Sequence, residues 1–389
     1  MKILFPYMAR WHAVNWTRYH SLLSALADAG HVVHVLQPPP LQSAETNFQE
    51  IARVDRPNVH VHDVPLAPAL WNARLPFDKL VKKAYFSYAA YGAARRLVER
   101  EGIDVLLLYN IPQYRLMSLP VPAIVFDYAD DYIDMLGHEL GRFDFAPVRR
   151  LAEKILHRMM QRATVTTAVS HVLAAQARGN VRVLPNGVSL AKARAAAARG
   201  SPGVASEGKP VVGFIGSFEY FIDLDLMYEV ARAMPEVHFL FVGTGRDWAG
   251  FKRRIEAAGL RNVQLTGGVP HEEVFAYIGA MDICLNLFRR IPVSHRACPI
   301  KLFEYLSQKK PVVSTRLEEL AYIDRGFLYY GDTPGEVVSQ IRAILADPQE
   351  AARRAAIGYE RTVSAYTWDR IAAEFAELVP RAQSARQAA

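Results

Sequence analysis

Residues 299–314 read Pro-Ile-Lys-Leu-Phe-Glu-Tyr-Leu-Ser-Gln-Lys-Lys-Pro-Val-Val-Ser, and they say more about the fold than any other stretch of the chain. Pro299 predicts the first turn of a helix, because its missing N–H costs nothing there. Lys301 and Glu304 are three residues apart and therefore share one face of that helix. The apolar run 311–314 predicts a short buried strand. The stretch thus predicts a helix followed directly by a strand of a sheet.

The spacing of Lys301 and Glu304 suits a nucleoside diphosphate. A helix N-terminus attracts anions, and a lysine in the first turn adds a full positive charge. A carboxylate one turn later can accept hydrogen bonds from the two vicinal hydroxyls of a ribose. The alternative is an i,i+3 ion pair on a surface helix, which spacing alone does not exclude.

The stretch closes an ordered series of segments that begins near Pro210. The earlier segments are residues 211–217, 239–245, 263–270 with the helix 272–278, and 281–286, and upstream lies Leu-Pro-Asn-Gly-Val at 184–188. In this order they resemble the donor-binding domain of GT-B glycosyltransferases, especially family 4 and its relatives. The resemblance is close from residue 184 onward and holds only in outline before it.

The resemblance implies an α/β fold with two Rossmann-like, doubly wound domains facing a cleft and a C-terminal helix that returns to the N-terminal domain. We therefore expect an acceptor-binding domain at 1–188, a donor-binding domain at 210–366 and the returning helix at 367–389. Residues 189–209 are rich in Ala, Gly, Ser and Pro, which predicts a linker with room for one short helix.

Alternating apolar and helical patterns in the first half independently predict a parallel sheet flanked by helices. The predicted strands of this half are residues 2–6, 31–36, 59–61, 105–109, 123–127, 164–169 and 181–184. The predicted helices are 17–29, 80–99, 147–161 and 171–177, and those of the tail are 334–346, 349–363 and 368–378.

Composition describes a globular protein of two domains, with 389 residues of which 51% are hydrophobic and 22% charged. No apolar run reaches the ~18–20 residues of a membrane span, and the N-terminal run 2–8 is too short for a signal peptide. Two cysteines, Cys284 and Cys298, predict reduced thiols. We expect a cytoplasmic protein, either free or peripheral at the inner face of the plasma membrane.

The net charge of +7 favours an anionic partner. Nucleic acid ranks low, because the basic residues are scattered and no nucleic-acid-binding signature is present. Residues 71–96 mix aromatic and basic side chains on a predicted amphipathic helix, which suits an anionic membrane surface. The alternative is that the apolar stripe belongs to the core and the charges are solvated.

The donor site is predicted in the second domain. Gly216 and Ser217 end its first strand, where backbone can approach a phosphate, although a plain turn is the alternative. The resemblance implies that the loop from Gly267 to His271 contacts the nucleobase, that Lys301 binds the diphosphate and that Glu304 binds the ribose. The predicted donor-binding residues are Gly216, Ser217, Gly243, Gly267, His271, Arg296, Lys301 and Glu304.

The chain departs from family 4 at two points. Retaining members carry Glu-x7-Glu, and the second Glu of this motif aligns with Glu304. The first position is occupied here by Arg296, with seven residues between the two. The usual Arg and Lys after the first strand are replaced by Ser-Phe-Glu-Tyr-Phe at 217–221. We therefore expect Lys301 to carry most of the phosphate charge, with help from Arg296 or Arg290. These features resemble the inverting xanthan glucuronosyltransferase subgroup and leave the stereochemistry open.

The catalytic residues are predicted in the first domain. Asp130 and Asp131 follow a predicted strand, and one of two paired carboxylates can have a raised pKa that suits a general base. The alternative is that one of them caps the next helix. His138 is a second candidate, and a structural histidine is its alternative.

The acceptor is predicted at the loop 7–16, which holds Arg10, Trp11 and His12. Its aromatic and basic side chains suit stacking on a sugar, or a hydrophobic clamp onto the neighbouring helix.

Together with these residues, the resemblance implies a glycosyltransferase, a hexosyl- or glycuronosyltransferase of bacterial polysaccharide biosynthesis. The donor would be a nucleoside-diphosphate sugar, UDP-sugar first, and the acceptor a glycan or a polyprenyl-linked glycan. No cofactor or metal is expected, since the acid pair at 223 and 225 starts a predicted helix. The rivals are a sugar-nucleotide epimerase of the same fold and a non-catalytic sugar-binding protein. A NAD-dependent dehydrogenase is disfavoured because Gly-x-Gly-x-x-Gly follows neither first strand.

Overall fold

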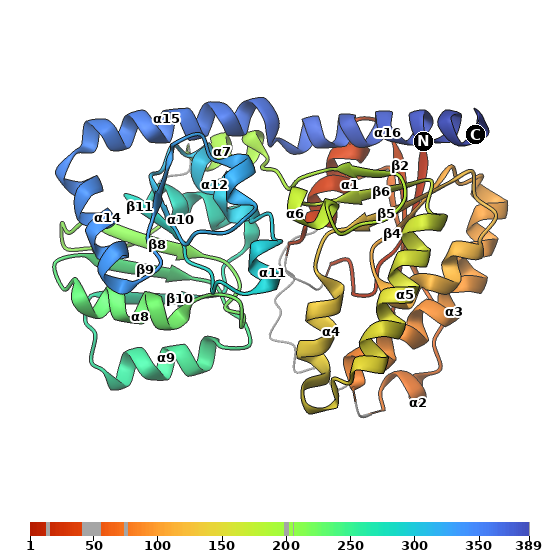
Figure 1. The fold of residues 1–389 in the computed structure, drawn as a ribbon, viewed down its shortest axis with the longest axis horizontal. Helices are drawn as coiled ribbons and strands as arrows, with labels where there is room; N and C mark the ends of the chain where they lie inside the picture. Colours follow the sequence, from red (N-terminus) through yellow and green to blue (C-terminus); the bar gives the residue numbers. More distant parts are fainter. Residues whose placement is uncertain (13–15, 41–55, 74–76, 198–201, 205, 389) are drawn as a thin grey trace. The chain divides into compact units, whose positions relative to one another are not determined.

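The computed structural model describes residues 1–389 except 13–15, 41–55, 74–76, 198–201, 205 and 389. The chain forms two compact units. Unit 1 comprises Met1–Pro185 and Trp368–Ala389, and unit 2 comprises Asn186–Thr367. Both termini therefore belong to unit 1 (Figure 1). The first passage between the units lies inside the Leu-Pro-Asn-Gly-Val turn, just before the expected boundary after residue 188.

Unit 1 is built on a seven-stranded parallel sheet of order β3-β2-β1-β4-β5-β6-β7. The strands are β1 Lys2–Pro6, β2 Val32–Gln37, β3 Val59–Asp63, β4 Val105–Leu108, β5 Ala123–Tyr128, β6 Val165–Ala168 and β7 Val181–Val183. The helices are α1 Arg18–Asp28, α2 Pro68–Trp71, α3 Asp78–Glu101, η1 Ile111–Ser118, α4 Tyr132–Leu140, η2 Gly141–Phe143, α5 Ala146–Arg162, α6 His171–Ala174 and α16 Trp368–Ala388. The central strands are buried along their whole length, because helices cover both faces of a parallel sheet.

Unit 2 repeats this design with a six-stranded parallel sheet of order β10-β9-β8-β11-β12-β13. The strands are β8 Val211–Ile215, β9 His238–Val242, β10 Val263–Gly267, β11 Ile283–Asn286, β12 Val312–Ser314 and β13 Leu328–Tyr330. The helices are α7 Leu190–Ala197, α8 Leu224–Ala233, α9 Trp248–Ala257, η3 His271–Glu273, α10 Val274–Gly279, α11 Pro292–His295, α12 Ile300–Ser307, α13 Leu320–Ile323, α14 Pro334–Ala346 and α15 Pro348–Ala365. In both sheets the strand order reverses beside the first strand of the unit, which makes each a doubly wound sheet.

Helix α12 is the element predicted from residues 299–314. It begins at Ile300, with Pro299 as the residue that flanks its first turn. Leu302, Phe303 and Leu306 are buried, and the Tyr305 hydroxyl accepts a hydrogen bond from the Ile215 backbone N–H at 3.0 Å. This bond fixes the helix against the end of β8. The following strand, β12, also occurs as predicted.

Residues 190–197, within the expected linker, form α7. Ala193 and Ala196 are buried in unit 2, and the Gln308 amide donates to the Ala193 carbonyl at 2.9 Å. This helix is therefore part of the packing around α12. Among the described residues, no helix is both long enough and apolar enough to cross a membrane.

Candidate functional site

The strand order of unit 2 reverses between β8 and β11 (Figure 1). Open α/β sheets bind ligands at such a point, outside the carboxyl ends of the strands. Gly216 follows β8, and Phe288 follows β11 by two residues. Helix α12 is held at the same point by the bond between Tyr305 and Ile215. The position of the predicted donor site and the position expected from topology therefore coincide.

The Lys301 ammonium lies at this switch point. Its Nζ atom is 4.1 Å from the centre of the Phe214 ring and 4.9 Å from that of the Phe288 ring. A Cβ atom added to Gly216 would lie 3.0 Å from Nζ, so the glycine leaves room for the cation. Within the described part of the chain, Lys301 makes no side-chain hydrogen bond or ion pair. Ring faces attract the cation and leave its three N–H donors available.

Three glycines gather at the ends of adjacent strands. Gly216 donates its N–H to the Val242 carbonyl at 3.0 Å, and Gly243 donates to the Gly267 carbonyl at 2.8 Å. Gly243 has φ 129°, and a Cβ atom there would overlap the Gly216 carbonyl oxygen. Only glycine permits this approach, so the ends of β8, β9 and β10 present bare backbone beside Lys301.

Burial favours the neutral forms of the two ionisable side chains of α12, Lys301 and Glu304. It lowers the pKa of Lys301 to about 7, although Glu304 opposes the change. It raises the pKa of Glu304 to about 7, against the positive charges of Lys301 and Lys192. Both side chains are half-buried, and no ion pair joins them. The alternative prediction of a surface i,i+3 ion pair is therefore wrong. A bound diphosphate would favour the charged form of Lys301.

The remaining predicted donor residues lie on loops and short helices of unit 2. Ser217 and His271 are half-buried, and His271 begins η3 after β10. Arg296, also half-buried, ends α11 before the turn into α12. Arg290, the alternative phosphate ligand, instead forms an ion pair with Asp332 at 3.3 Å.

The acid pair at 223 and 225 has structural contacts. Asp223 caps α8 by accepting a hydrogen bond from the Leu226 N–H at 3.0 Å. Asp225 pairs with Arg289 at 3.0 Å. In the described ranges, no group of three or more His, Cys, Asp or Glu side chains is arranged to hold a metal ion.

The predicted acid pair of unit 1 has two different environments. Asp131 is buried and caps α4 through its Oδ1, which accepts from the Asp134 N–H at 3.1 Å. The capping alternative therefore holds for Asp131. Asp130 is exposed and is not a cap. His138 is exposed near the end of α4. The carboxylate that remains available for proton transfer is that of Asp130.

The surroundings of Asp130 raise the pKa of its carboxyl group. Desolvation raises the pKa of its carboxyl to about 7, the negative charge of Asp127 adds to the shift and Arg18 opposes it. Because the side chain is exposed, water weakens the upward shift of this pKa. A raised pKa brings the carboxylate closer to the strength of an efficient general base at neutral pH.

Sequence reasoning missed a buried ion pair beside Asp130. Arg18 contacts both carboxylate oxygens of Asp127 at 2.9 and 3.1 Å, and the Thr167 hydroxyl donates to the same carboxylate at 2.7 Å. Arg18 also donates to the Leu184 and Pro185 carbonyls at 2.8 Å, at the end of the first segment of unit 1. The sequence does place an acid, Asp127, near the end of an apolar strand, and a carboxylate buried there needs a partner of opposite charge.

The prediction that Trp11 stacks on a sugar is wrong. Its ring is 1% exposed, stacks on His20 with centroids 4.3 Å apart, and meets Phe5 and Tyr7 edge-on. The His20 Nε2 lies 2.8 Å from the Trp11 carbonyl oxygen. Trp11 therefore fits the alternative prediction, a hydrophobic clamp onto α1, while residues 13–15 of the loop lie outside the described residues.

The other two predicted acceptor residues remain closer to solvent. Arg10 donates to the Pro38 carbonyl at 2.9 Å and pairs with Asp63 at 3.3 Å. His12 is half-buried, and its Nδ1 has no hydrogen-bond partner in the described structure.

Residues 71–96 divide between core and surface. Trp71 and Phe86 are buried, as the alternative prediction had it. Phe77, Val81 and Tyr88 are exposed on the same stretch. Residues 74–76 lie outside the described residues.

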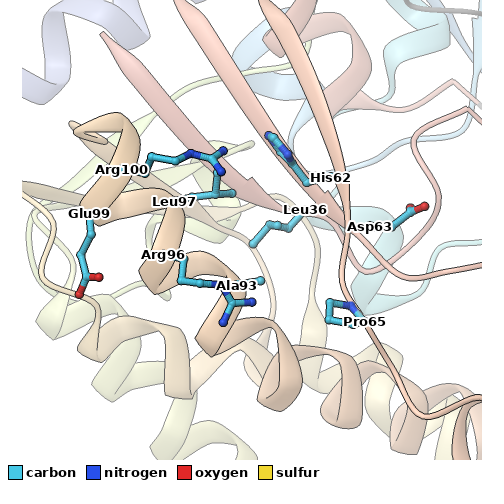
Figure 2. Close-up of a pocket in the computed structure, with 9 residues that line it drawn as sticks. All are labelled: Leu36, His62, Asp63, Pro65, Ala93, Arg96, Leu97, Glu99 and Arg100. Atoms are coloured by element: carbon cyan, nitrogen blue, oxygen red, sulfur yellow. The ribbon is translucent and has the colours of Figure 1, made fainter.

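A pocket of about 510 Å³ lies elsewhere on unit 1, between β2, β3 and the second half of α3 (Figure 2). Its lining residues are Leu36, His62, Asp63, Pro65, Ala93, Arg96, Leu97, Glu99 and Arg100. None of them belongs to the predicted site, although Asp63 is the partner of Arg10.

Two family models match the chain, one in each half. The model described as "Glycosyl transferase 4-like domain" matches residues 16–187, and that described as "Glycosyl transferase-like" matches residues 225–377. The chain is 31% identical over 141 residues to the putative teichuronic acid biosynthesis glycosyltransferase TuaH of Bacillus subtilis (strain 168). That match covers 35% of this chain and 34% of the relative, so the likeness spans about a third of either protein.

Solved structures resemble the chain over nearly its whole length. Sucrose-phosphate synthase from Thermosynechococcus elongatus superposes with a TM-score of 0.73 at 17% identity, covering 97% of this chain and 98% of that one. Anabaena HepE in complex with UDP and glucose superposes with a TM-score of 0.67 at 15% identity and the same coverages. At these identities the likeness shows the fold, and it confirms the expected pair of Rossmann-like domains of GT-B type.

Proposed function

We propose that this chain, which has the GT-B fold and carries a glycosyl transferase 4-like and a glycosyl transferase-like domain, transfers a sugar from a nucleoside-diphosphate donor to a glycan. One observation carries the proposal. The Lys301 ammonium lies at the switch point of the unit 2 sheet beside bare glycine backbone, with its N–H donors unused by the described residues.

In the proposed complex the diphosphate lies against Lys301, the N-terminus of α12 and the backbone at Gly216 and Ser217. Glu304 accepts hydrogen bonds from the ribose hydroxyls, and the loop from Gly267 to His271 contacts the base. Arg296 adds positive charge near the phosphates. The donor that we favour is a UDP-sugar, in keeping with the UDP that HepE binds.

The chemistry that we propose requires no metal. Lys301 and the α12 N–H groups would stabilise the negative charge that develops on the departing diphosphate. Asp130 would remove the proton of the acceptor hydroxyl while its oxygen attacks the anomeric carbon and the bond to the diphosphate breaks. That single displacement inverts the anomeric configuration, as in the xanthan glucuronosyltransferase subgroup.

The acceptor that we propose is a glycan, carried on a polyprenyl lipid at the cytoplasmic face of a membrane. Support comes from the similarity to a relative named for teichuronic acid biosynthesis. The pathway would then be the synthesis of a bacterial surface or extracellular polysaccharide, with a hexosyl or glycuronosyl unit transferred.

A thermal-shift panel of UDP-, GDP- and TDP-sugars tests the donor. A ligand at 100 times its Kd stabilises the folded protein by about 2.7 kcal/mol, so one nucleotide should raise Tm by several degrees. The same sugar, radiolabelled, should then pass to a bacterial membrane extract, and the transfer should persist in excess EDTA.

The outcomes separate the alternatives. A Tm shift without transfer to any extract would favour a sugar-binding protein, and conversion of the free nucleotide sugar would favour an epimerase. Absence of any shift across the panel would contradict the proposed donor. Transfer that EDTA abolishes and Mg²⁺ or Mn²⁺ restores would contradict the metal-free chemistry.

A further inference from the structure

Exposed apolar side chains concentrate on unit 1. Of the ten large apolar residues exposed in the described structure, eight belong to this unit and two to unit 2. Six of the eight come from the start of α3, from η2 and from the start of α5. We call these six the α3–α5 surface: Phe77, Val81, Phe143, Phe145, Val148 and Leu151.

Contacts between the elements join these side chains into one surface. The rings of Phe77 and Phe143 meet edge to face with their centres 5.3 Å apart, which brings α3 next to η2. Lys83 on α3 pairs with Glu139 on α4 at 3.5 Å. Helices α3, α4 and α5 cluster on the same side of unit 1 in Figure 1.

The first turn of α5 is fixed to α4 as well. Arg149 pairs with Asp144, and its guanidinium occupies the space that a side chain at Gly137 would fill. The apolar residues around it are therefore held in place, although Phe145 and Leu151 remain more than half exposed, at 55% and 59%. Leaving such side chains in water is unfavourable unless a partner covers them.

Along the exposed face of α5, apolar side chains come first and basic side chains follow. Val148, Leu151, Lys154 and Arg158 follow one another at spacings of three or four residues and so share one helix face. Its opposite face, with Ala152, Leu156, Met159 and Met160, is buried. Along the exposed face the side chains change from aliphatic to basic over about 15 Å, at 1.5 Å per residue.

The basic residues of this face carry uncompensated charge. Arg150, Lys154 and Arg158 make no hydrogen bond or ion pair with the described residues, and Glu153 is the one acid among them. Arg149 is already neutralised by Asp144. The surface thus combines an aromatic and aliphatic tip with positive charge one to two turns behind it.

We propose that the α3–α5 surface docks on the surface of an anionic phospholipid bilayer. Its apolar tip would enter the boundary between headgroups and acyl chains, to the 5–10 Å depth usual for such helices, while Lys154 and Arg158 meet lipid phosphates. Charge selects this occupant over a second copy of the chain, because two such faces would bring like charges together.

Of the predicted stretch 71–96 this inference keeps Phe77 and Val81 and leaves out Trp71 and Phe86, which are buried. It rests in part on the proposed function, since a lipid-carried acceptor would place the enzyme at a membrane. Vesicle binding can nevertheless be measured without any transfer, so the two proposals fail separately.

Co-sedimentation with vesicles of phosphatidylcholine containing 40% phosphatidylglycerol, as against phosphatidylcholine alone, tests the proposal on the full chain. The chain should bind the anionic vesicles and bind much less to neutral ones or at 1 M salt. The double variant Lys154→Glu/Arg158→Glu should lower the partition coefficient by at least tenfold, since each basic residue is worth about fivefold, or about 1 kcal/mol. Phe145→Ser/Leu151→Ser should lower it by at least tenfold as well.

Matched controls lie on unit 2. Arg253→Glu reverses an exposed charge, and Tyr322→Ser removes an exposed ring, so neither should change vesicle binding. UDP affinity should be the same in all variants, which shows that they fold. Equal loss in the Arg253 variant would mean non-specific attraction and overturn the proposal. So would absence of binding to anionic vesicles, or apolar variants that bind normally and instead lose a dimer in sedimentation equilibrium.

Discussion

At the scale of single residues, the candidate donor site holds two charged side chains, and neither forms a side-chain hydrogen bond or an ion pair with the described residues. Lys301 and Glu304 lie one turn apart, yet burial shifts the pKa of each to about 7, from above and from below. Two groups that were paired with each other for stability would shift in the opposite directions. A binding site explains the arrangement, because the missing partners would be those of a ligand.

Asp130→Asn should slow transfer by about 10²–10⁴-fold and leave UDP affinity unchanged, because it removes a general base and no donor contact. Steady-state kinetics and calorimetry on the same preparation measure the two effects. Product NMR should show the anomeric configuration opposite to that of the donor.

Asp131→Ala provides the contrast. Loss of its cap on α4 should lower the free energy of unfolding by about 0.5–2 kcal/mol. A fully active Asp130→Asn enzyme would shift the base to Asp131 or His138. A product of retained configuration would rule out a single displacement.

The residue-level predictions fail where burial decides the role of a side chain, and the donor-binding role of Lys301 stays a prediction. Lys301 is placed by helix periodicity and by a proline, both readable in one segment. Trp11 is not, since composition cannot tell a ring that stacks on a ligand from one that stacks on His20. The contact between Arg18 and Asp127 joins residues far apart in the chain, so no local pattern announces it.

At the scale of elements, most predicted strands coincide with observed ones to within about two residues. Runs such as Val-Leu-Leu-Leu at 105–108 are apolar at every position, which is typical of strands buried on both faces. For α4 the sequence predicts only a helix capped by Asp130 or Asp131 and no bounds, because Gly137 lies inside it. Helix α7 agrees with the one short helix expected in the linker, but the composition does not show that its alanines are buried against α10 and α12.

Histidines on β3, an edge strand of unit 1, and on the neighbouring β2 predict a pH dependence of stability. His34 on β2 is 4% exposed, and its Nδ1 lies 3.2 Å from Nε2 of His62 on β3. Burial lowers the pKa of His34 to about 4, with the charges of His62 and His60 adding to the effect, Glu101 opposing it and Lys2 contributing a little. The unfolded chain takes up this proton near pH 6.5, before the folded chain does.

The contribution of His34 to stability is therefore complete above pH 6.5 and is lost as the pH falls from about 6.5 to about 4. The loss is on the order of 3 kcal/mol at most. His34→Leu should weaken the dependence of Tm on pH between 7.5 and 5.0, as followed by calorimetry. His157→Gln on α5 is the control and should keep it. An unchanged pH dependence in the His34 variant would contradict the role of this cluster.

At the scale of the whole molecule, the chain is two doubly wound sheets of the same basic strand order. That order cannot be read from strand lengths or composition, since any permutation of parallel strands has the same apolar pattern. It became predictable through the succession of glycine turns that resembles one family. We propose that the second of these sheets holds a nucleoside diphosphate at its switch point.

Calorimetric titration of UDP into the full chain and into Lys301→Ala measures this binding. The substitution should weaken binding by about 2–3 kcal/mol, because a charge-assisted contact to the diphosphate is lost. Affinity of the unaltered chain should also fall as the pH rises above about 7, where Lys301 loses its proton. Lys252→Ala, an exposed lysine on α9, should bind UDP as the unaltered chain does. Equal affinity in the Lys301 and Lys252 variants would contradict the account.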